Sequence, residues 1–341
     1  MTSHSRSEMR LIAMLLLSLV ARASPQCPNL PNELTDHAAE ITCNYEFSCV
    51  EGFFVDYAKT AEQYEGGKVI TQPGLGLLDR AYDGEDTHDA NESARWARFA
   101  NYVQRLNSQS KDGESYKVLF LIRHGFGVHN QVMEKVGSQA WNHDWSHRDG
   151  DGELIWADAH LVDAGITQAK SLGEFWLNGV QNEAMPLPGT IYTSPLARCL
   201  ETTKLVYAPV FSAHQRKLQP TIKERLREFL TDHTCDRRST RSWIHENYPD
   251  YIIEEDFGEH DVLWHADKAE SMEEHVVRKQ KLLEDIFTHD ASPFISLTTH
   301  SYAISALLSA VGAPMFRVGE GVMVPLFVKA EKIALGTTKG V

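Results

Sequence analysis

The stretch that decides the fold is residues 117–130, K-V-L-F-L-I-R-H-G-F-G-V-H-N. Its apolar run 118–122 stops at Arg123-His124-Gly125, and such a run bounded by glycine predicts a buried strand that ends in a tight turn. Such turns in parallel sheets carry functional groups, because the next helix begins there and its unpaired N–H groups can hold an anion. His124 beside a guanidinium is therefore a candidate phosphate-handling nucleophile. The alternative is an Arg-His pair hydrogen-bonded to nearby carbonyls.

The composition is that of a globular protein. The chain has 341 residues and 42% apolar content, enough for one large core or two ordinary ones. Its formal net charge of −14 argues against nucleic acid and anionic membrane surfaces as partners. Because an anionic substrate is repelled at long range, a phosphate site must be built from a few local cations.

The N-terminus has the pattern of a secretory signal. Arg6 and Arg10 precede an apolar run at 11–20, and Ala21-Arg22-Ala23 has the form of a cleavage site, so residues 1–23 are predicted to be a signal peptide. A membrane anchor is the alternative, but a bilayer span needs about 20 apolar residues. We therefore expect a secreted or vacuolar protein without stable membrane insertion after cleavage.

The cysteines fit a secretory route. Residues 24–50 carry Pro and Cys without sustained periodicity and are interpreted as an N-terminal arm. Cysteines are usually paired in oxidising compartments, so one disulfide is expected within this cluster, with its connectivity open. The odd total leaves at least one thiol unpaired within the chain. The cysteines are Cys27, Cys43 and Cys49 near the arm, and Cys199 and Cys235 further on.

Two polar stretches raise the question of further sites. Asn91-Glu92-Ser93 is an N-glycosylation acceptor in a loop-like segment. In the Trp- and His-rich segment 141–156, His143 and His147 have a metal-ligand spacing, and D-G-D-G-E at 149–153 partly matches a calcium loop. The complete calcium pattern is absent. We therefore predict a polar surface loop near a substrate entrance and no metal ligand.

The apolar periodicity predicts alternating strands and helices. This pattern indicates one α/β domain at 51–335, a three-layer α/β/α sandwich with a mainly parallel sheet. Strands are expected at 118–122, at 190–193, ending near 222, at 293–297 and, near a sheet edge, at 322–329. Helices are expected from 93 onward, over 163–177, from 194 to about 207, over 272–287 and over 302–311.

Three strand ends gather groups suited to phosphate chemistry. His124 and His300 each precede a helix, and Arg198 lies on the first turn of a third, where Ser194 is the expected N-cap with Pro195 inside. One neutral imidazole can attack phosphorus while cations and N–H groups hold the equatorial oxygens. A carboxylic acid can protonate the leaving group, and either Glu224 or Glu228 can supply it. Alternatively, Arg198 is a surface residue of an amphipathic helix.

These residues carry a resemblance to the histidine phosphatase superfamily, also called phosphoglycerate mutase-like, and in particular to its fungal and plant branch. The resemblance covers about residues 51–332. R-H-G alone is a weak signal, but five motifs in the family's order are far more specific. They are R-H-G-F-G-V-H-N (123–130), D-A-H-L-V-D-A-G-I-T-Q-A (158–169), S-P-L-A-R-C (194–199), L-R-E-F (226–229) with C-D-R-R-S (235–239), and T-H-S (299–301).

The resemblance implies a role for each matching residue. It makes His124 the nucleophile that becomes phosphohistidine and Glu228 the proton donor. The phosphate pocket is then formed by Arg123, Asn130, Arg198 and His300, with His300 counted among the catalytic residues. For Asn130 the alternative is a helix-start cap. His129, Arg237 and Arg238 lie within these motifs and could touch the substrate, but ordinary hydrogen bonds and ion pairs are the alternative.

Two positions depart from the family's pattern. Phe126 stands where a polar residue is usual, which puts a substrate contact in doubt. Val162 stands where a helix-capping Thr is common, and Asp163 is expected to take over the cap. Neither departure removes a catalytic group.

We therefore predict a phosphomonoester hydrolase of the histidine acid phosphatase type, acting on a small phosphorylated substrate without a metal or other cofactor. The first alternative is a phosphomutase, which returns the phosphate to an organic hydroxyl instead of water. The second is a noncatalytic secreted protein that binds a phosphorylated ligand. The oligomeric state is left open.

Overall fold

Strand β3 (Glu114–Arg123) contains the predicted nucleophile strand and lies inside a seven-stranded sheet. The computed structural model describes residues 45–85 and 94–333, and residues 47–332 form one compact unit. The other strands of the sheet are β1 (Tyr45–Cys49), β4 (Thr190–Thr193), β5 (Thr221–Ile222), β6 (Ile252–Ile253), β7 (Phe294–Thr299) and β9 (Met323–Lys332).

The sheet has the order β1-β9-β3-β7-β4-β5-β6. From β3 to β6 each neighbouring pair is parallel, whereas β9 runs antiparallel to β3 from Glu114↔Glu331 to Ile122↔Met323. This long pairing explains why β3 is longer than its apolar run. A separate parallel pair joins β2 (Lys68–Val69) to β8 (Arg317–Val318). The predicted α/β sandwich with a mainly parallel sheet is confirmed.

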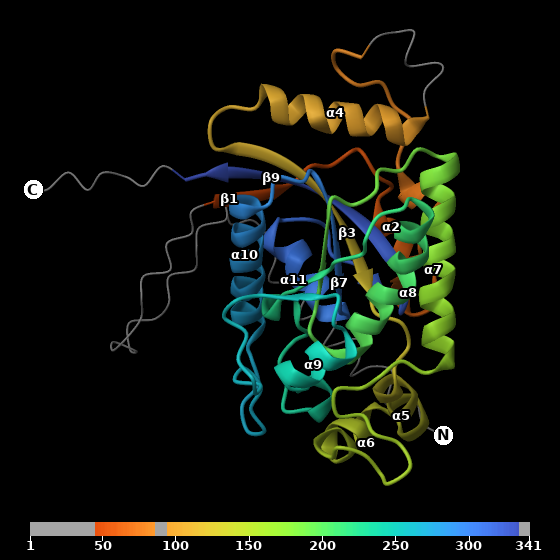
Figure 1. The fold of residues 1–341 in the computed structure, drawn as a ribbon, viewed down its shortest axis with the longest axis vertical. Helices are drawn as coiled ribbons and strands as arrows, with labels where there is room; N and C mark the ends of the chain where they lie inside the picture. The colour runs from red at the N-terminus through yellow and green to blue at the C-terminus, as the bar shows by residue number, and fades with distance from the viewer. Residues whose placement is uncertain (1–44, 86–93, 334–341) are drawn as a thin grey trace, which may run out of the picture. The chain divides into compact units, whose positions relative to one another are not determined.

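Helices cover both faces of this sheet. In Figure 1, α7 and α8 lie on one side of β3 and β7, with α10 and α11 on the other. The helices are α2 (Tyr57–Ala61), α4 (Arg95–Gln109), α5 (Val128–Val136), α6 (Ser138–His143), α7 (Asp163–Asn182), α8 (Ala197–Ala213), α9 (Arg241–Asn247), α10 (Met272–His289) and α11 (Ser301–Ala310). Short 3-10 turns are η1 (Glu65–Gly67), η2 (Pro73–Gly76), η3 (Trp145–His147), η4 (Glu224–Leu226) and η5 (Thr234–Asp236).

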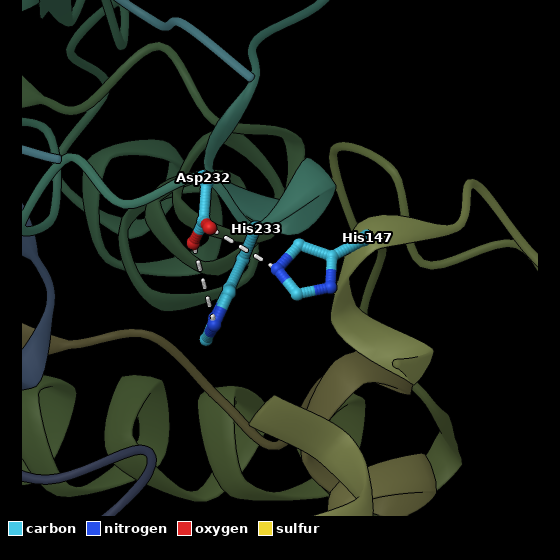
Figure 2. Close-up of side chains that lie close together, drawn as sticks. All are labelled: His147, Asp232 and His233. Carbon is cyan, nitrogen blue, oxygen red and sulfur yellow. Dashed lines mark hydrogen bonds and ion pairs between the residues drawn. The ribbon is translucent and has the colours of Figure 1, made fainter. Parts of the chain in front are cut away.

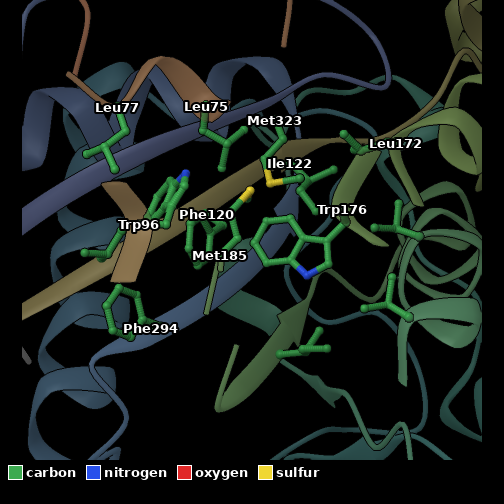
Figure 3. Close-up of a cluster of buried hydrophobic side chains, with 14 of the residues drawn as sticks. Leu75, Leu77, Trp96, Phe120, Ile122, Leu172, Trp176, Met185, Phe294 and Met323 are labelled. Atoms are coloured by element: carbon green, nitrogen blue, oxygen red, sulfur yellow. The ribbon is translucent and has the colours of Figure 1, made fainter. Parts of the chain in front are cut away.

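The main core lies between β3 and the helices α4, α7 and α8. Phe120 of β3 packs edge-on against Trp176 of α7, with ring centroids 4.8 Å apart, and also contacts Trp96 of α4 (Figure 3). Alternate β3 residues can enter this core because successive side chains point to opposite faces of a sheet. The core therefore holds β3 in place, and with it the position of His124, which follows the last residue of this strand.

Helix α8 differs from the prediction at both ends. It begins at Ala197 rather than just after Ser194, and Asp158 accepts the Ala197 N–H at 2.8 Å, so the cap comes from a distant residue. It also continues past Pro209 to Ala213. Proline costs one helical hydrogen bond, and the buried side chains on both sides of it, Tyr207 and Phe211 among them, offset that loss by packing.

One further local prediction is corrected. Val162, not Asp163, is the N-cap of α7, and no side chain caps it; Asp163 is the first helical residue, where its charge favours the helix N-terminus. Glu224 lies in the short turn η4, which ends at Leu226, so Glu228 lies just beyond it.

Several sequence predictions fall outside the described residues. These include the signal peptide 1–23, Cys27, Cys43 and the glycosylation acceptor at Asn91. Cys49 is a free thiol within β1, and no disulfide occurs in the described ranges. Residues 45–49 thus belong to the sheet edge rather than to an irregular arm. In the part of the chain that the structure describes, no helix has both the length and the apolarity of a membrane span.

Candidate active site

The turn after β3 is held by close packing against α7. A Cβ at Gly125 would overlap the backbone carbonyl of Gly165, and a Cβ at Gly165 would lie 2.7 Å from the amide nitrogen of Phe126. The Phe126 N–H also donates to Gln168 Oε1 at 2.8 Å. Two glycines and one glutamine therefore fix the R-H-G turn. This contact explains why D-A-H-L-V-D-A-G-I-T-Q-A accompanies that turn.

His124 is buried at the end of β3, with 2% of its surface exposed. Its Nδ1 lies 2.8 Å from the carbonyl oxygen of Gly125. A carbonyl can only accept, so Nδ1 carries the proton and Nε2 keeps a lone pair. Burial, followed by the charges of Arg198 and Arg123, lowers the pKa of His124 well below its ordinary value of 6.5. The imidazole is therefore held neutral, as a nucleophile requires.

Arg123 and Arg198 place two guanidinium charges near His124. Arg123 donates to the Val318 carbonyl at 2.8 Å and pairs with Glu320 at 2.7 Å. Arg198 donates to the Cys235 carbonyl at 2.7 Å and pairs with Asp236 at 3.3 Å. In both residues Nε is buried and has no hydrogen-bond partner among the described residues. Each arginine is thus fixed by its terminal nitrogens and retains an unused donor.

His300 lies beside His124, because each follows the carboxyl end of one of two neighbouring parallel strands, β7 and β3. The two ring centroids are 5.1 Å apart in an edge-on arrangement. Its Nε2 lies 2.8 Å from Ser194 Oγ and 3.3 Å from Cys199 Sγ. Burial and the charge of Arg198 lower its pKa well below 6.5. The structure therefore brings together both histidines and the arginine that sequence analysis found at separate strand ends.

Glu228 lies at the N-terminus of α11. Its carboxylate accepts N–H groups from Phe229 at 2.9 Å, Ala303 at 3.0 Å and Tyr302 at 3.3 Å. Burial, followed by the nearby charge of Asp236, raises the pKa of Glu228 above its ordinary value of 4.5, although the backbone N–H groups oppose this shift. A raised pKa favours the protonated form that a general acid needs.

Asn130 has a structural contact in this pocket. Its Oδ1 accepts the Gly127 N–H at 3.0 Å across the start of α5, which is the cap that we considered as the alternative. Asn130 is buried. His129 of the same helix has its ring 5.5 Å from that of His124, and its buried Nδ1 has no partner in the described ranges. His129 is therefore a third unused polar group near the nucleophile.

The partners that hold these groups were missed by sequence reasoning. Glu320 fixes Arg123 and Asp236 fixes Arg198, while Asp158 adopts a positive φ of 43° and accepts N–H groups from Ala197 and Ser239. Each lies far in sequence from the residue it holds. Two quoted motifs gave a signal, because C-D-R-R-S contains Asp236 and D-A-H-L-V-D-A-G-I-T-Q-A begins at Asp158, whereas Glu320 lies in none of them.

The side chains of Arg237 and Arg238 differ in how many of their donors are already bonded. Arg238 pairs with Glu224 at 2.5 Å and donates to four backbone carbonyls, so its donors are already occupied. Arg237 is partly exposed and pairs with Asp149 at 2.7 Å. Both line a groove of about 610 Å³ together with Asp158, Trp243 and Trp264.

His143 and His147, which have a metal-ligand spacing in the sequence, do not lie on one helix. His143 ends α6 and His147 lies in the separate turn η3. Instead, His147 lies within reach of Asp232 and His233. Sequence spacing alone could not reveal this second cluster, because its members come from distant segments.

The fold and the site together define an α/β protein with two buried arginines beside a neutral imidazole at the end of a sheet strand. The chain belongs to the histidine phosphatase superfamily: the family model described as "Histidine phosphatase superfamily (branch 1)" matches residues 119–317. It is 40% identical over 306 residues to a "Probable phosphoglycerate mutase" of Arthroderma benhamiae, covering 89% of this chain and 90% of the relative.

Two further similarities were found. The chain is 33% identical to "Probable phosphoglycerate mutase PMU1" of Saccharomyces cerevisiae, over 63% of this chain and 79% of the relative. A solved structure titled "Mycobacterial hydrolase 1" matches 64% of this chain and 97% of its own, with 19% identity and a TM-score of 0.39. Membership of the superfamily supports an enzyme of the phosphatase or mutase type that acts on a phosphorylated small molecule.

Proposed function

We propose that the protein is a phosphomonoester hydrolase that works through a phosphohistidine at His124. One observation carries this proposal: Arg123 Nε, Arg198 Nε and His129 Nδ1 are buried without partners around a neutral imidazole. A buried unsatisfied donor costs about 1–3 kcal/mol. The oxygens of a bound phosphoryl group would satisfy such donors, so the pocket is complementary to that ligand.

The first step is transfer of the phosphoryl group to the enzyme. His124 Nε2 attacks phosphorus, a P–N bond forms and the P–O bond to the leaving group breaks. Arg123, Arg198 and His300 hold the equatorial oxygens as their charge is redistributed. Protonated Glu228 gives its proton to the departing alkoxide. The products of this step are a free alcohol and phosphohistidine.

The second step regenerates the enzyme. Water attacks the phosphohistidine, the P–N bond breaks and the Glu228 carboxylate takes a proton from that water. Inorganic phosphate leaves, and His124 and Glu228 return to their starting forms. This route uses only side chains, so we propose that it needs no metal ion or organic cofactor.

A phosphomutase is the second candidate, and the printed names of the two fungal relatives favour it. A mutase must hold a second phosphate or carboxylate close to the first. Within the described ranges, the neighbouring cations Arg227 and Arg238 are paired with Asp261 and Glu224. Arg238 has no unused donor, whereas Arg227 Nε is buried without a partner, so a second phosphate would find at most one free donor on these two cations, which supports the hydrolase.

One experiment distinguishes the candidates. Purified protein is mixed with an aryl phosphate between pH 4 and 8, with and without a chelator, and both released phosphate and covalent labelling are measured. The hydrolase predicts phosphate release that survives chelation and is lost in His124→Ala but kept in His245→Ala, an exposed position on α9.

The other outcomes have separate meanings. Labelling of His124 without release to water would favour the mutase. Absence of labelling with aryl phosphates, sugar phosphates and phosphoglycerates would leave the noncatalytic binding protein. Isothermal titration with inorganic phosphate then measures whether the pocket binds phosphate.

We also propose that the protein enters the secretory route, because residues 1–23 have the charge and apolar pattern of a signal peptide. N-terminal sequencing of protein secreted from a eukaryotic host tests this assignment, which predicts a mature start at Ser24. A glycosidase shift that is lost in Asn91→Gln tests the glycosylation acceptor.

A further inference from the structure

A cluster outside the phosphate pocket joins two histidines to one aspartate. His147 Nε2 lies 3.1 Å from Asp232 Oδ2, and His233 Nε2 lies 3.9 Å from Asp232 Oδ1. Figure 2 shows both imidazoles directed at the same carboxylate. The three candidate ligand atoms lie within 4.8 Å of one another. They come from η3 and from the segment just before η5, which are far apart in sequence.

We propose that His147, Asp232 and His233 form a binding site for a divalent transition metal such as Zn²⁺. Zinc takes imidazole nitrogens and carboxylate oxygens at about 2.0–2.2 Å in tetrahedral geometry. Ligand atoms around such an ion are about 3.3 Å apart. The observed separations need only small side-chain rotations to reach this arrangement, and a water molecule would complete the fourth position.

The segments that carry these ligands are already tied together. Thr234 Oγ1 donates to the Arg148 carbonyl at 2.6 Å, and Arg237 pairs with Asp149 at 2.7 Å. Each link joins residues next to the ligands on the two segments. The geometry is therefore largely set before an ion binds, which reduces the conformational entropy lost on binding.

Aromatic packing supports the same geometry. Trp141 meets the His233 ring edge-on at 6.1 Å, and Trp264 Nε1 donates to the His233 carbonyl at 2.9 Å. Trp141 belongs to a small core with Trp156 and Cys235. His233 thus has a rigid support, whereas the side chains of His147 and Asp232 are 40% and 42% exposed and leave a path for the ion.

A simple surface ion pair explains the cluster less well. Such a pair contributes about 0–1 kcal/mol and involves one histidine. Here a second imidazole faces the other oxygen of the same carboxylate, and the two ring centroids are 5.9 Å apart. Imidazole ligands suit zinc, copper and nickel, whereas magnesium and calcium prefer all-oxygen sites. The donor set therefore selects the metal class.

This site adjoins the segment that holds Arg198. His233 is followed by η5, whose Cys235 carbonyl and Asp236 carboxylate both contact that guanidinium. A bound ion would stiffen η5 without touching the reacting phosphate. Zinc binding is thus a property separate from hydrolysis, and the proposal does not depend on the proposed function.

Titration of the metal-stripped full-length protein with ZnCl₂ by calorimetry tests the site. We expect a zinc site whose affinity falls at least about tenfold in His147→Ala, Asp232→Asn and His233→Ala, as loss of a ligand or its support requires. His143→Ala is the matched control on the neighbouring helix and should keep the affinity. His124→Ala should keep it too, which separates this site from the imidazoles of the phosphate pocket.

Two results would overturn the proposal. One is wild-type protein that binds no zinc, and the other is zinc binding that Asp232→Asn and His147→Ala leave unchanged. Both substitutions affect partly exposed side chains, so they remain informative even if His233→Ala fails to fold; circular dichroism reports this. X-ray absorption of zinc-loaded protein should show two imidazole ligands, and MgCl₂ should give no binding heat.

Discussion

The pKa values of two residues, His124 and Glu228, are shifted in opposite directions. Burial and two arginines lower the pKa of His124, while burial and Asp236 raise that of Glu228. Both shifts favour the combination of a neutral His124 with a protonated Glu228. These are the forms that the first chemical step requires, so the environment of each group matches its proposed role.

This pairing predicts the pH dependence of the reaction. Activity should persist below pH 6.5, because His124 is protonated only at lower pH. It should fall as pH rises through the raised pKa of Glu228, because the proton donor is then lost. The measurement is kcat/KM for an alkyl phosphate, which has a poor leaving group, as a function of pH.

Glu228→Gln provides the control for this prediction. The variant should lose activity by about 10²–10⁴-fold with the alkyl phosphate. It should lose much less with an aryl phosphate, whose leaving group needs little protonation. An equal loss with both substrates would assign Glu228 a role other than proton donor.

The sequence identified the groups with intrinsic chemistry but not those that hold them. R-H-G and T-H-S mark His124 and His300 because each lies at a strand end before a helix. Glu320 and Asp236 gave no comparable signal, since their importance comes from tertiary contacts with Arg123 and Arg198. Asn130 shows the converse, because the same residue type serves equally well as a helix cap.

The close contact between the R-H-G turn and helix α7 can be tested by adding a methyl group at Gly165. Alanine is normally favoured over glycine inside a helix. Gly165→Ala should nevertheless lower the free energy of unfolding by about 1–3 kcal/mol, because its Cβ meets the backbone of Phe126. It should also lower kcat/KM, since His124 lies two residues before Phe126.

Chemical denaturation and steady-state kinetics measure the two effects. Ser171→Ala, at an exposed position of the same helix, is the matched control and should be neutral or slightly stabilising. If Gly165→Ala behaved like this control, the close approach would not constrain the turn.

Side chains of helix α10 hold the backbone of the segment that carries Glu228. Buried Lys279 donates to the carbonyls of Arg225 and Arg227, and Arg278 donates to the carbonyl of Glu228 at 2.7 Å. Lys279→Met should destabilise the protein by about 2–4 kcal/mol, because two buried carbonyls lose their donor. As a positioning residue, Lys279 should also affect the alkaline limb of the pH profile.

The readouts are the denaturation midpoint and kcat/KM with alkyl and aryl phosphates. A larger loss with the alkyl phosphate would locate the damage at Glu228. Lys281→Met, exposed on the same helix, should change neither quantity. A purely structural role for Lys279 would instead give equal losses with both substrates.

Local patterns predicted most elements but not all of their ends. Strand β4 and helix α10 follow from apolar periodicity and local caps, including the Ser271–Glu274 capping box. The ends of helix α8 do not follow from local patterns. Asp158, which is distant in sequence, caps its first turn, and packing of buried side chains allows the helix to continue past Pro209. Ends that depend on distant residues cannot be read from neighbouring ones.

The buried neutral histidines make the free energy of unfolding of the whole molecule depend on pH. Burial lowers the pKa of His124, His129 and His300 well below 6.5, and that of His275 to about 3. The unfolded chain then binds more protons than the folded one below pH 6.5. Stability is therefore fully present above pH 6.5 and is lost as the pH falls toward the folded pKa values.

Urea denaturation at pH 7.5 and pH 5.5 measures this effect. The loss approaches about 1.4 kcal/mol per pH unit for each histidine that stays neutral in the folded state. His275→Phe should reduce the difference between the two pH values, whereas exposed His245→Gln should not. A midpoint that is equal or higher at pH 5.5 would contradict the prediction.

The antiparallel pairing of β9 with β3 also bears on how the protein is made. β3 lies between β7 and β9, both of which are synthesised long after it. Until the ribosome has released residues 323–332, the apolar edge of β3 has no permanent neighbour. Pairings this distant in sequence form slowly. We therefore expect the nascent chain to depend on chaperones during this interval, and the catalytic pocket to be among the last parts to assemble.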